Sequence, residues 1–175
     1  MEVNDLITEI AESGREATDD EITRIRVHVA GVGFEPGGWT KAGIPIAGLS
    51  WEGHIVRSSD RMENAIVHFL RHTVAQREWP EGTTLDEYIA SLRQATQYAD
   101  GGITLERQHQ QWRLSFISRA YGAAGPDSGG WILVGYPLEY GYWSTGFQPE
   151  FGLRHVILNT AEGERWLCKP LTQNT

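Results

Sequence analysis

The stretch "ITLERQHQQWRLSFISRAYGAAGPDSGGWILVGY", residues 103–136, decides the fold class. It contains short segments in which apolar residues alternate with polar ones or run together, separated by turn sequences such as "GPDSGG" at 125–130. This pattern is typical of antiparallel strands joined by tight turns. With two similar segments that follow, the candidate strands are 103–108, 112–118, 131–136, 141–147 and 154–158. The second half of the chain therefore predicts a four- to five-stranded antiparallel meander.

Helical patterns occupy the region before this stretch. Apolar residues recur every three or four positions in 2–13, and Gly14 follows as a stop signal. A second helix is predicted from Ser59 to about residue 74, and a third begins at the capping box Thr84-Leu85-Asp86-Glu87 and runs to about residue 98. Helices first and a sheet afterwards predict an α+β domain.

Residues 19–30 allow two interpretations. Thr18 and Glu21 form a capping box, which predicts a helix over these residues. The competing interpretation is a strand, because apolar and polar residues alternate over 24–29. We favour the helix, because the capping box precedes the pattern directly.

Residues 31–53 separate the chain into two parts. They are rich in glycine and show no period, which is typical of an irregular connection, although their large apolar residues favour packing over a free linker. We expect an acidic helical segment with a glycine-rich connection over 1–53 and an α+β domain over 54–175. The first part carries 10 acidic against 4 basic residues, the second 13 against 11.

Composition excludes several classes of protein. The chain of 175 residues is 40% hydrophobic and has 7 Trp, which is enough for a globular core. Its one cysteine, Cys168, rules out an intrachain disulfide and a multi-cysteine metal site. No apolar run reaches 18 residues and the start is acidic, so we expect no transmembrane segment or signal peptide, and either a cytoplasmic protein or one delivered within a larger polypeptide. The net charge of −8 disfavours non-specific binding of nucleic acid.

The first candidate site is "HFLRH" at 68–72. On a helix His68 and His72 share one face, with Arg71 beside them. A solvated helix edge is one explanation, and a zinc site is another, although zinc needs further ligands and we expect no metal or other cofactor. The third is acid–base catalysis, because two imidazoles can accept one proton and donate another while a guanidinium holds an anion. Such a group suits metal-free cleavage of RNA, and which histidine is the base stays open.

The second candidate site is "YGYWSTGFQPEFG" at 140–152. It places the Thr145 hydroxyl at a strand end, where it can donate to a phosphate oxygen, and Phe147 beside it can stack on a base. A purely structural role is a strong alternative for this stretch, because aromatic residues at strand ends are commonly part of the core.

Together the two stretches resemble a known family. "HFLRH" at 68–72, "TLDEY" at 84–88 and "WSTGFQPEFG" at 143–152 are similar to the C-terminal domains of bacterial polymorphic toxins, in which an HFxKH helix, an EY helix and a TxFxP turn follow in this order. These domains are metal-independent ribonucleases of the barnase–EndoU–colicin–RelE (BECR) fold. The longer pattern is also similar to a group of uncharacterised actinobacterial proteins. The resemblance covers roughly residues 60–158.

The resemblance implies an RNA-cleaving toxin that acts in bacterial competition, with a cognate immunity protein or antitoxin as a partner. The catalytic positions would be held by His68, Arg71, His72 and Thr145. Substrate-binding and supporting positions would be held by Tyr88, Phe147 and Gln148. Arg71 stands where the family usually has lysine, and Gln148 stands where a lysine is often found.

Two other functions remain open. A non-catalytic immunity or accessory module would dock a basic partner through an acidic surface, and it requires buried, hydrogen-bonded histidines and an exposed patch formed by Glu9, Glu12, Glu16, Asp19 and Asp20. An enzyme acting on a small carbohydrate or nucleotide would use tryptophans such as Trp112 and Trp143 as stacking platforms. His109 and His155 are further candidates for either site, although a structural role is expected for both.

Overall fold

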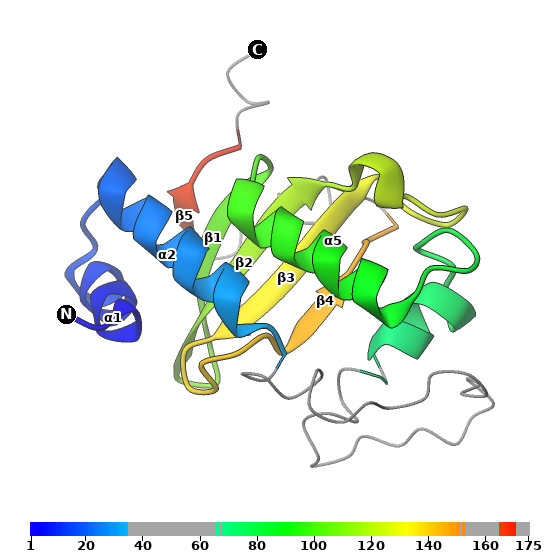
Figure 1. Cartoon of the computed structure of the whole chain (residues 1–175). Helices are drawn as coiled ribbons and strands as arrows, with labels where there is room; N and C mark the ends of the chain where they lie inside the picture. Colours follow the sequence, from blue (N-terminus) through cyan, green and yellow to red (C-terminus); the bar gives the residue numbers. More distant parts are fainter. Residues whose placement is uncertain (35–65, 67, 151, 153–164, 171–175) are drawn as a thin grey trace.

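The computed structural model describes residues 1–34, 66, 68–150, 152 and 165–170. In this part of the chain, helices precede a five-stranded antiparallel sheet, so the predicted α+β fold class is confirmed. Helices α2 (Asp19–Val32) and α5 (Leu85–Tyr98) lie side by side across one face of the sheet, and α1 (Val3–Ser13) packs next to α2 (Figure 1).

The sheet is an antiparallel meander with one added strand. Its order is β4-β3-β2-β1-β5, so four successive strands are neighbours and β5 pairs with the outer side of β1. The first three predicted strands are confirmed, the prediction at 154–158 lies outside the described residues, and the sequence does not predict β5. The strands are β1 (Gly102–Gln108), β2 (Gln111–Arg119), β3 (Trp131–Pro137), β4 (Thr145–Phe147) and β5 (Arg165–Cys168).

The strand predicted over 141–147 is wrong for its first four residues, because only Thr145–Phe147 pairs with β3. The Trp143 backbone N–H donates to the Gly33 carbonyl at 2.5 Å, and its indole N–H donates to the Val29 carbonyl at 2.9 Å. The segment before Thr145 is thus bound to the C-terminal end of α2 instead of continuing the ladder along β3.

Both predicted capping boxes are present. The Thr18 hydroxyl accepts from the Glu21 backbone N–H, and the Thr84 hydroxyl accepts from that of Glu87, while each glutamate carboxylate accepts from the N–H of its cap residue. Each box satisfies backbone donors that the first helical turn leaves without partners. The starts of α2 and α5 are therefore fixed by local sequence.

The helix interpretation of residues 19–30 is confirmed, and its strand alternative is wrong. Ile25 and Val29 are fully buried, whereas Val27 between them is 67% exposed. A spacing of four between buried residues matches the period of an α-helix, and strand alternation would have buried Val27 together with the other two.

The main core lies between the helices and one face of the sheet. Residues from α1 and α2 belong to the same buried cluster as those of α5 and the sheet. Burial of each such side chain contributes about 1.5–3 kcal/mol. The expected division of the chain near residue 53 falls outside the described residues and stays a prediction. The strand side chains in this core are Ile103, Leu105, Leu114, Phe116, Ile132, Val134 and Tyr136.

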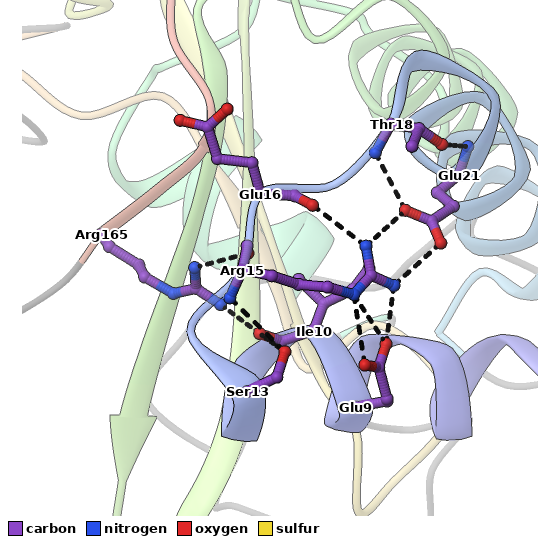
Figure 2. Close-up of polar contacts among 8 residues, drawn as sticks. All are labelled: Glu9, Ile10, Ser13, Arg15, Glu16, Thr18, Glu21 and Arg165. Carbon is purple, nitrogen blue, oxygen red and sulfur yellow. Dashed lines mark hydrogen bonds and ion pairs between the residues drawn. The ribbon is translucent and has the colours of Figure 1, made fainter.

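Helix α1 is fastened to its neighbours by two arginines (Figure 2). The Arg15 guanidinium donates to the carboxylates of Glu9 in α1 and Glu21 in α2, with shortest N–O distances of 2.6 and 2.9 Å. Arg165 of β5 donates to the carbonyls of Ile10 at 2.7 Å and Arg15 at 3.1 Å. The C-terminal end of α1 is thereby joined to both α2 and the edge of the sheet.

The Arg15 contact predicts a pH dependence of stability. Hydrogen bonds from Arg15 and from the Thr18 backbone lower the pKa of Glu21 from 4.5 to about 2. Because the folded pKa is the lower one, the stabilisation is complete above about pH 4.5 and is lost as the pH falls through about 2. Between about pH 5 and pH 2 we expect the melting temperature of Glu21→Gln to fall less steeply than that of the wild type, as followed by circular dichroism. Glu12→Gln, at an exposed α1 position, serves as the control, and parallel curves for Glu21→Gln and the wild type would contradict the prediction.

None of the helices in the described part of the chain has the length and apolar composition that a membrane-spanning segment needs.

Candidate functional site

The "HFLRH" motif lies where a helix changes its winding. The predicted helix 59–74 is described from residue 66 onward, apart from residue 67, and its last part, Leu70–Ala75, is a π-helix. The Gln76 N–H donates to the Arg71 carbonyl, five residues back, at 2.8 Å. Short π-helical turns occur often at functional sites. After the π-helix the chain folds back on it, since the Glu78 N–H donates to the His72 carbonyl at 2.9 Å.

His72 forms a buried pair with Glu78. Its Nδ1 lies 2.6 Å from Oε2 of Glu78 and 3.0 Å from Oε1 of Gln76, and the two residues of the pair are 7% and 5% exposed. Two oxygen acceptors at Nδ1 place the ring proton on that atom, so neutral His72 carries its lone pair on Nε2. A carboxylate behind an imidazole is the arrangement that orients a general base.

The two histidines belong to a column of four rings. Phe34 stacks on His68 with 5.7 Å between centroids, His68 stacks on His72 at 5.7 Å, and His72 stacks on Phe147 at 5.8 Å. The interplanar angles are 20°, 13° and 28°. The column joins the end of α2 to β4, and it brings together the two motifs that the sequence singled out.

Glu78 also holds the end of β4. Its Oε1 accepts from the Gln148 backbone N–H at 2.5 Å, while its Oε2 faces His72. The Gln148 side chain is 1% exposed, accepts from the Ser128 hydroxyl and donates to the Ala123 carbonyl at 2.8 Å. Both polar atoms of the Gln148 side chain are therefore bonded to the protein, and this residue positions the strand end.

Tyr88 supports the site from behind. It is fully buried, and its hydroxyl donates to the Gly146 carbonyl at 2.5 Å. Burial raises the pKa of this hydroxyl, Glu78 raises it further, and Arg71 lowers it. Arg71 and Glu78 therefore both lie within electrostatic reach of the Tyr88 hydroxyl.

Thr145 and Phe147 lie on the same face of β4, because they are two residues apart in a strand. Both are partly exposed, as are His68 and Arg71, so side chains from both motifs reach the surface near the ring column. The remaining histidine candidates lie elsewhere: His109 is exposed in the turn after β1, and His155 is outside the described residues.

A depression of about 800 Å³ opens beside Glu78 and Phe147. The end of the π-helix, the loop before β3 and the end of β4 form its wall. The charged side chains among its described lining residues are the carboxylates of Glu78, Asp127 and Glu150. The full lining is Ala75, Gln76, Glu78, Pro126, Asp127, Ser128, Phe147, Gln148, Pro149 and Glu150.

The sequence pattern does not predict Glu78 as part of the site. It lies six residues after His72, beyond the helix, and it reaches the imidazole because the chain turns at Arg77, which has a φ of 53°. A non-glycine residue rarely takes this conformation, and the "QREW" sequence contains no glycine or asparagine that would predict it. An acidic residue shortly after a histidine-bearing helix was the available signal.

The geometry also bears on the other candidate chemistries. Trp143 is fully buried, so it offers no exposed stacking platform, whereas Trp112 is partly exposed beneath the Arg107 guanidinium. Among the described residues no three His, Cys, Asp or Glu side chains are grouped so that they could hold a metal ion.

Comparison of the chain with protein-family models, curated proteins and solved structures finds no match in any of the three. The arrangement of the site is therefore the guide to function.

Proposed function

We propose that the chain is a metal-independent endoribonuclease of the toxin type, which cleaves RNA, with tRNA as one candidate substrate, by acid–base catalysis. The observation that carries the proposal is the buried His72–Glu78 pair, whose imidazole stacks on Phe147 of β4. An oriented imidazole, a second imidazole beside it and a nearby guanidinium are the groups that this reaction needs.

His72 is the base in the proposed reaction. Its Nε2 removes the proton from the ribose 2′-hydroxyl, and the resulting oxygen attacks the neighbouring phosphorus. The bond from phosphorus to the 5′-oxygen breaks, and His68 gives that oxygen a proton. Glu78 stabilises the imidazolium that forms on His72, as a buried carboxylate does behind a catalytic histidine. The products are a 2′,3′-cyclic phosphate and a free 5′-hydroxyl.

Arg71 and Thr145 would act on the phosphate. The guanidinium stays charged and donates to non-bridging oxygens, whose charge builds up during attack. The Thr145 hydroxyl donates from the strand side. Phe147 would stack on a base, a contact worth about 1–3 kcal/mol per base in single-strand binding.

The direct test is to incubate the purified chain with total RNA or tRNA in EDTA. We expect fragments that end in 2′,3′-cyclic phosphate, and we expect an oligonucleotide with 2′-deoxyribose at the cleaved position to stay intact. RNA that remains uncut at micromolar protein would overturn the proposal.

A second function is favoured by another observation. Glu9, Glu12, Glu16, Asp19 and Asp20 are all exposed. Of the two histidines that a non-catalytic module requires to be buried and hydrogen-bonded, His72 meets the requirement and His68 is partly exposed. Such a module would dock a basic partner through α1 and the start of α2. Uncut RNA together with co-purification of a basic protein would favour this function.

For the ribonuclease, the proposed setting is the bacterial cytoplasm, reached directly or by delivery into a target cell as part of a larger polypeptide. Its partners would be RNA and a cognate immunity protein. An acidic inhibitor surface would suit the RNA-binding face, because such a surface imitates phosphate charge.

A further inference from the structure

Gly135 allows an arginine to cross β3. A Cβ atom at Gly135 would lie 3.1 Å from Cζ of Arg113 and closer still to its Nη2, and it would lie 3.0 Å from the methyl group of Thr145. The register pairs Gly135 with Thr145, and it pairs Arg113 with Pro137, two residues further along β3. The Arg113 guanidinium therefore lies over the strand backbone and borders Thr145. A glycine inside a strand often marks such a close approach.

The guanidinium is held in place from its other side. Nε of Arg113 lies 3.4 Å from Oε1 of Glu106, which is directly opposite on β1. The exposed fractions of the two side chains are 22% and 19%, so both are partly accessible to solvent, although Nε of Arg113 itself is buried. Glu106 faces the Nε edge, while Nη2 is the nitrogen that lies toward Gly135. The cation is thereby directed at the strand that carries the second motif.

Arg113 lies on the sheet face that carries Thr145 and Phe147. The residues of β3 point alternately to the two faces of the sheet. Ile132, Val134 and Tyr136 point into the main core on the face covered by α5, so Gly135 lies on the opposite face. Along it, the Arg113 guanidinium borders Thr145, Phe147 follows two residues later, and the Phe147 ring stacks on His72. Two residues of a strand span about 7 Å, close to the spacing of successive phosphates in an extended single strand.

We infer that Arg113 binds a backbone phosphate of a single-stranded nucleic acid that lies along this row of residues. The inference rests on the proposed function and deepens it, because it adds a substrate-binding residue that the sequence motifs do not contain. Arg113, a residue of β2, provides a cation beside Thr145 of β4. A guanidinium offers the planar pair of N–H donors that fits a phosphate.

The test measures binding without cleavage. The full chain is titrated into a short, labelled oligothymidylate, which has no 2′-hydroxyl, and anisotropy is recorded over a series of salt concentrations. We expect Arg113→Gln to weaken binding roughly tenfold at low salt and to reduce the slope of log affinity against log salt by about 0.7, the value for one phosphate contact of a single strand. Arg107→Gln is the matched control, because Arg107 is an exposed arginine of the same sheet whose position in β1 alternates to the other face.

Gly135→Ala tests the geometry without changing the charge. Its added methyl group displaces the guanidinium, so its affinity should fall toward that of Arg113→Gln, with melting curves confirming that each variant is folded. Equal affinity of Arg113→Gln and Arg107→Gln, or no binding by the wild type, would overturn the inference. The RNA-cleavage test is independent: cut RNA with unchanged Arg113→Gln binding would leave the proposed function standing without this residue. Uncut RNA together with Arg113-dependent binding would overturn the proposed function and leave the inference about Arg113 standing.

Discussion

Replacing His72 by alanine is expected to lower the rate of RNA cleavage by about 10²–10⁴-fold, the range for loss of a general base. The reason is the position of its ring: Nδ1 is bonded to Glu78, so Nε2 is the nitrogen that takes up a proton. The measurement is single-turnover cleavage of a labelled RNA in EDTA, with the wild type and the variant at equal concentration.

Alanine at position 72 also removes a partner from Glu78, so a second variant separates catalysis from folding. Asparagine keeps an N–H donor near the Glu78 carboxylate but provides no base, and His72→Asn should therefore lose activity while retaining more stability. His109→Asn is the matched control, because His109 is an exposed histidine with a φ of 51°, a conformation that asparagine accepts. Unchanged cleavage by His72→Asn would exclude His72 as the base.

Replacing Glu78 by alanine is expected to lower the free energy of unfolding by about 3 kcal/mol, because two buried donors lose their acceptor at about 1–3 kcal/mol each. The loss has two sources. His72 would lose its 2.6 Å contact, and the Gln148 backbone N–H would be left buried without the acceptor that it has at 2.5 Å. Urea unfolding followed by tryptophan fluorescence measures the change.

Two further variants test whether the lost contacts of Glu78 cause that change in stability. Glu78→Gln keeps one oxygen, which can still accept from the Gln148 N–H, and it places an NH2 group against Nδ1 of His72. That NH2 group can donate to Nδ1 if His72 takes its other neutral tautomer, so the cost should be nearer 1 kcal/mol, in the range of a single hydrogen bond. Glu81→Ala removes an exposed glutamate three residues along the chain, and it should stay within about 0.5 kcal/mol of the wild type. If Glu78→Ala matched Glu81→Ala, the buried pair would contribute nothing to folding.

The parts of the fold that local sequence determines could be predicted. The capping boxes at Thr18 and Thr84 work because a cap and its partner are three residues apart, and strands β1 to β3 follow from alternation between turns. β5 could not be predicted, because its four residues form a strand only through pairing with β1, across a register irregularity at Ile103 and Thr104. Such long-range pairing leaves no local pattern.

In the candidate site, too, the contacts that depend on local sequence could be predicted and the long-range contacts could not. Helical spacing placed His68 and His72 next to each other, and their rings stack. The contact of His72 with Phe147 comes from residues 75 positions apart, and the contact with Glu78 depends on a π-helix and a left-handed residue at Arg77. Propensity rules describe neither of these. The close approach of Arg113 to β3 does have a signal in the sequence, because Gly135 interrupts an otherwise apolar strand.

The order of the strands has a consequence for self-association. The two outermost strands of the described sheet, β4 and β5, are also its shortest, with 3 and 4 residues, whereas the long strands β2 and β1 are enclosed. An outer strand with free backbone groups is a template on which another chain can add a strand, and a short one offers few such groups. We therefore expect the folded chain to resist edge-to-edge aggregation when concentrated.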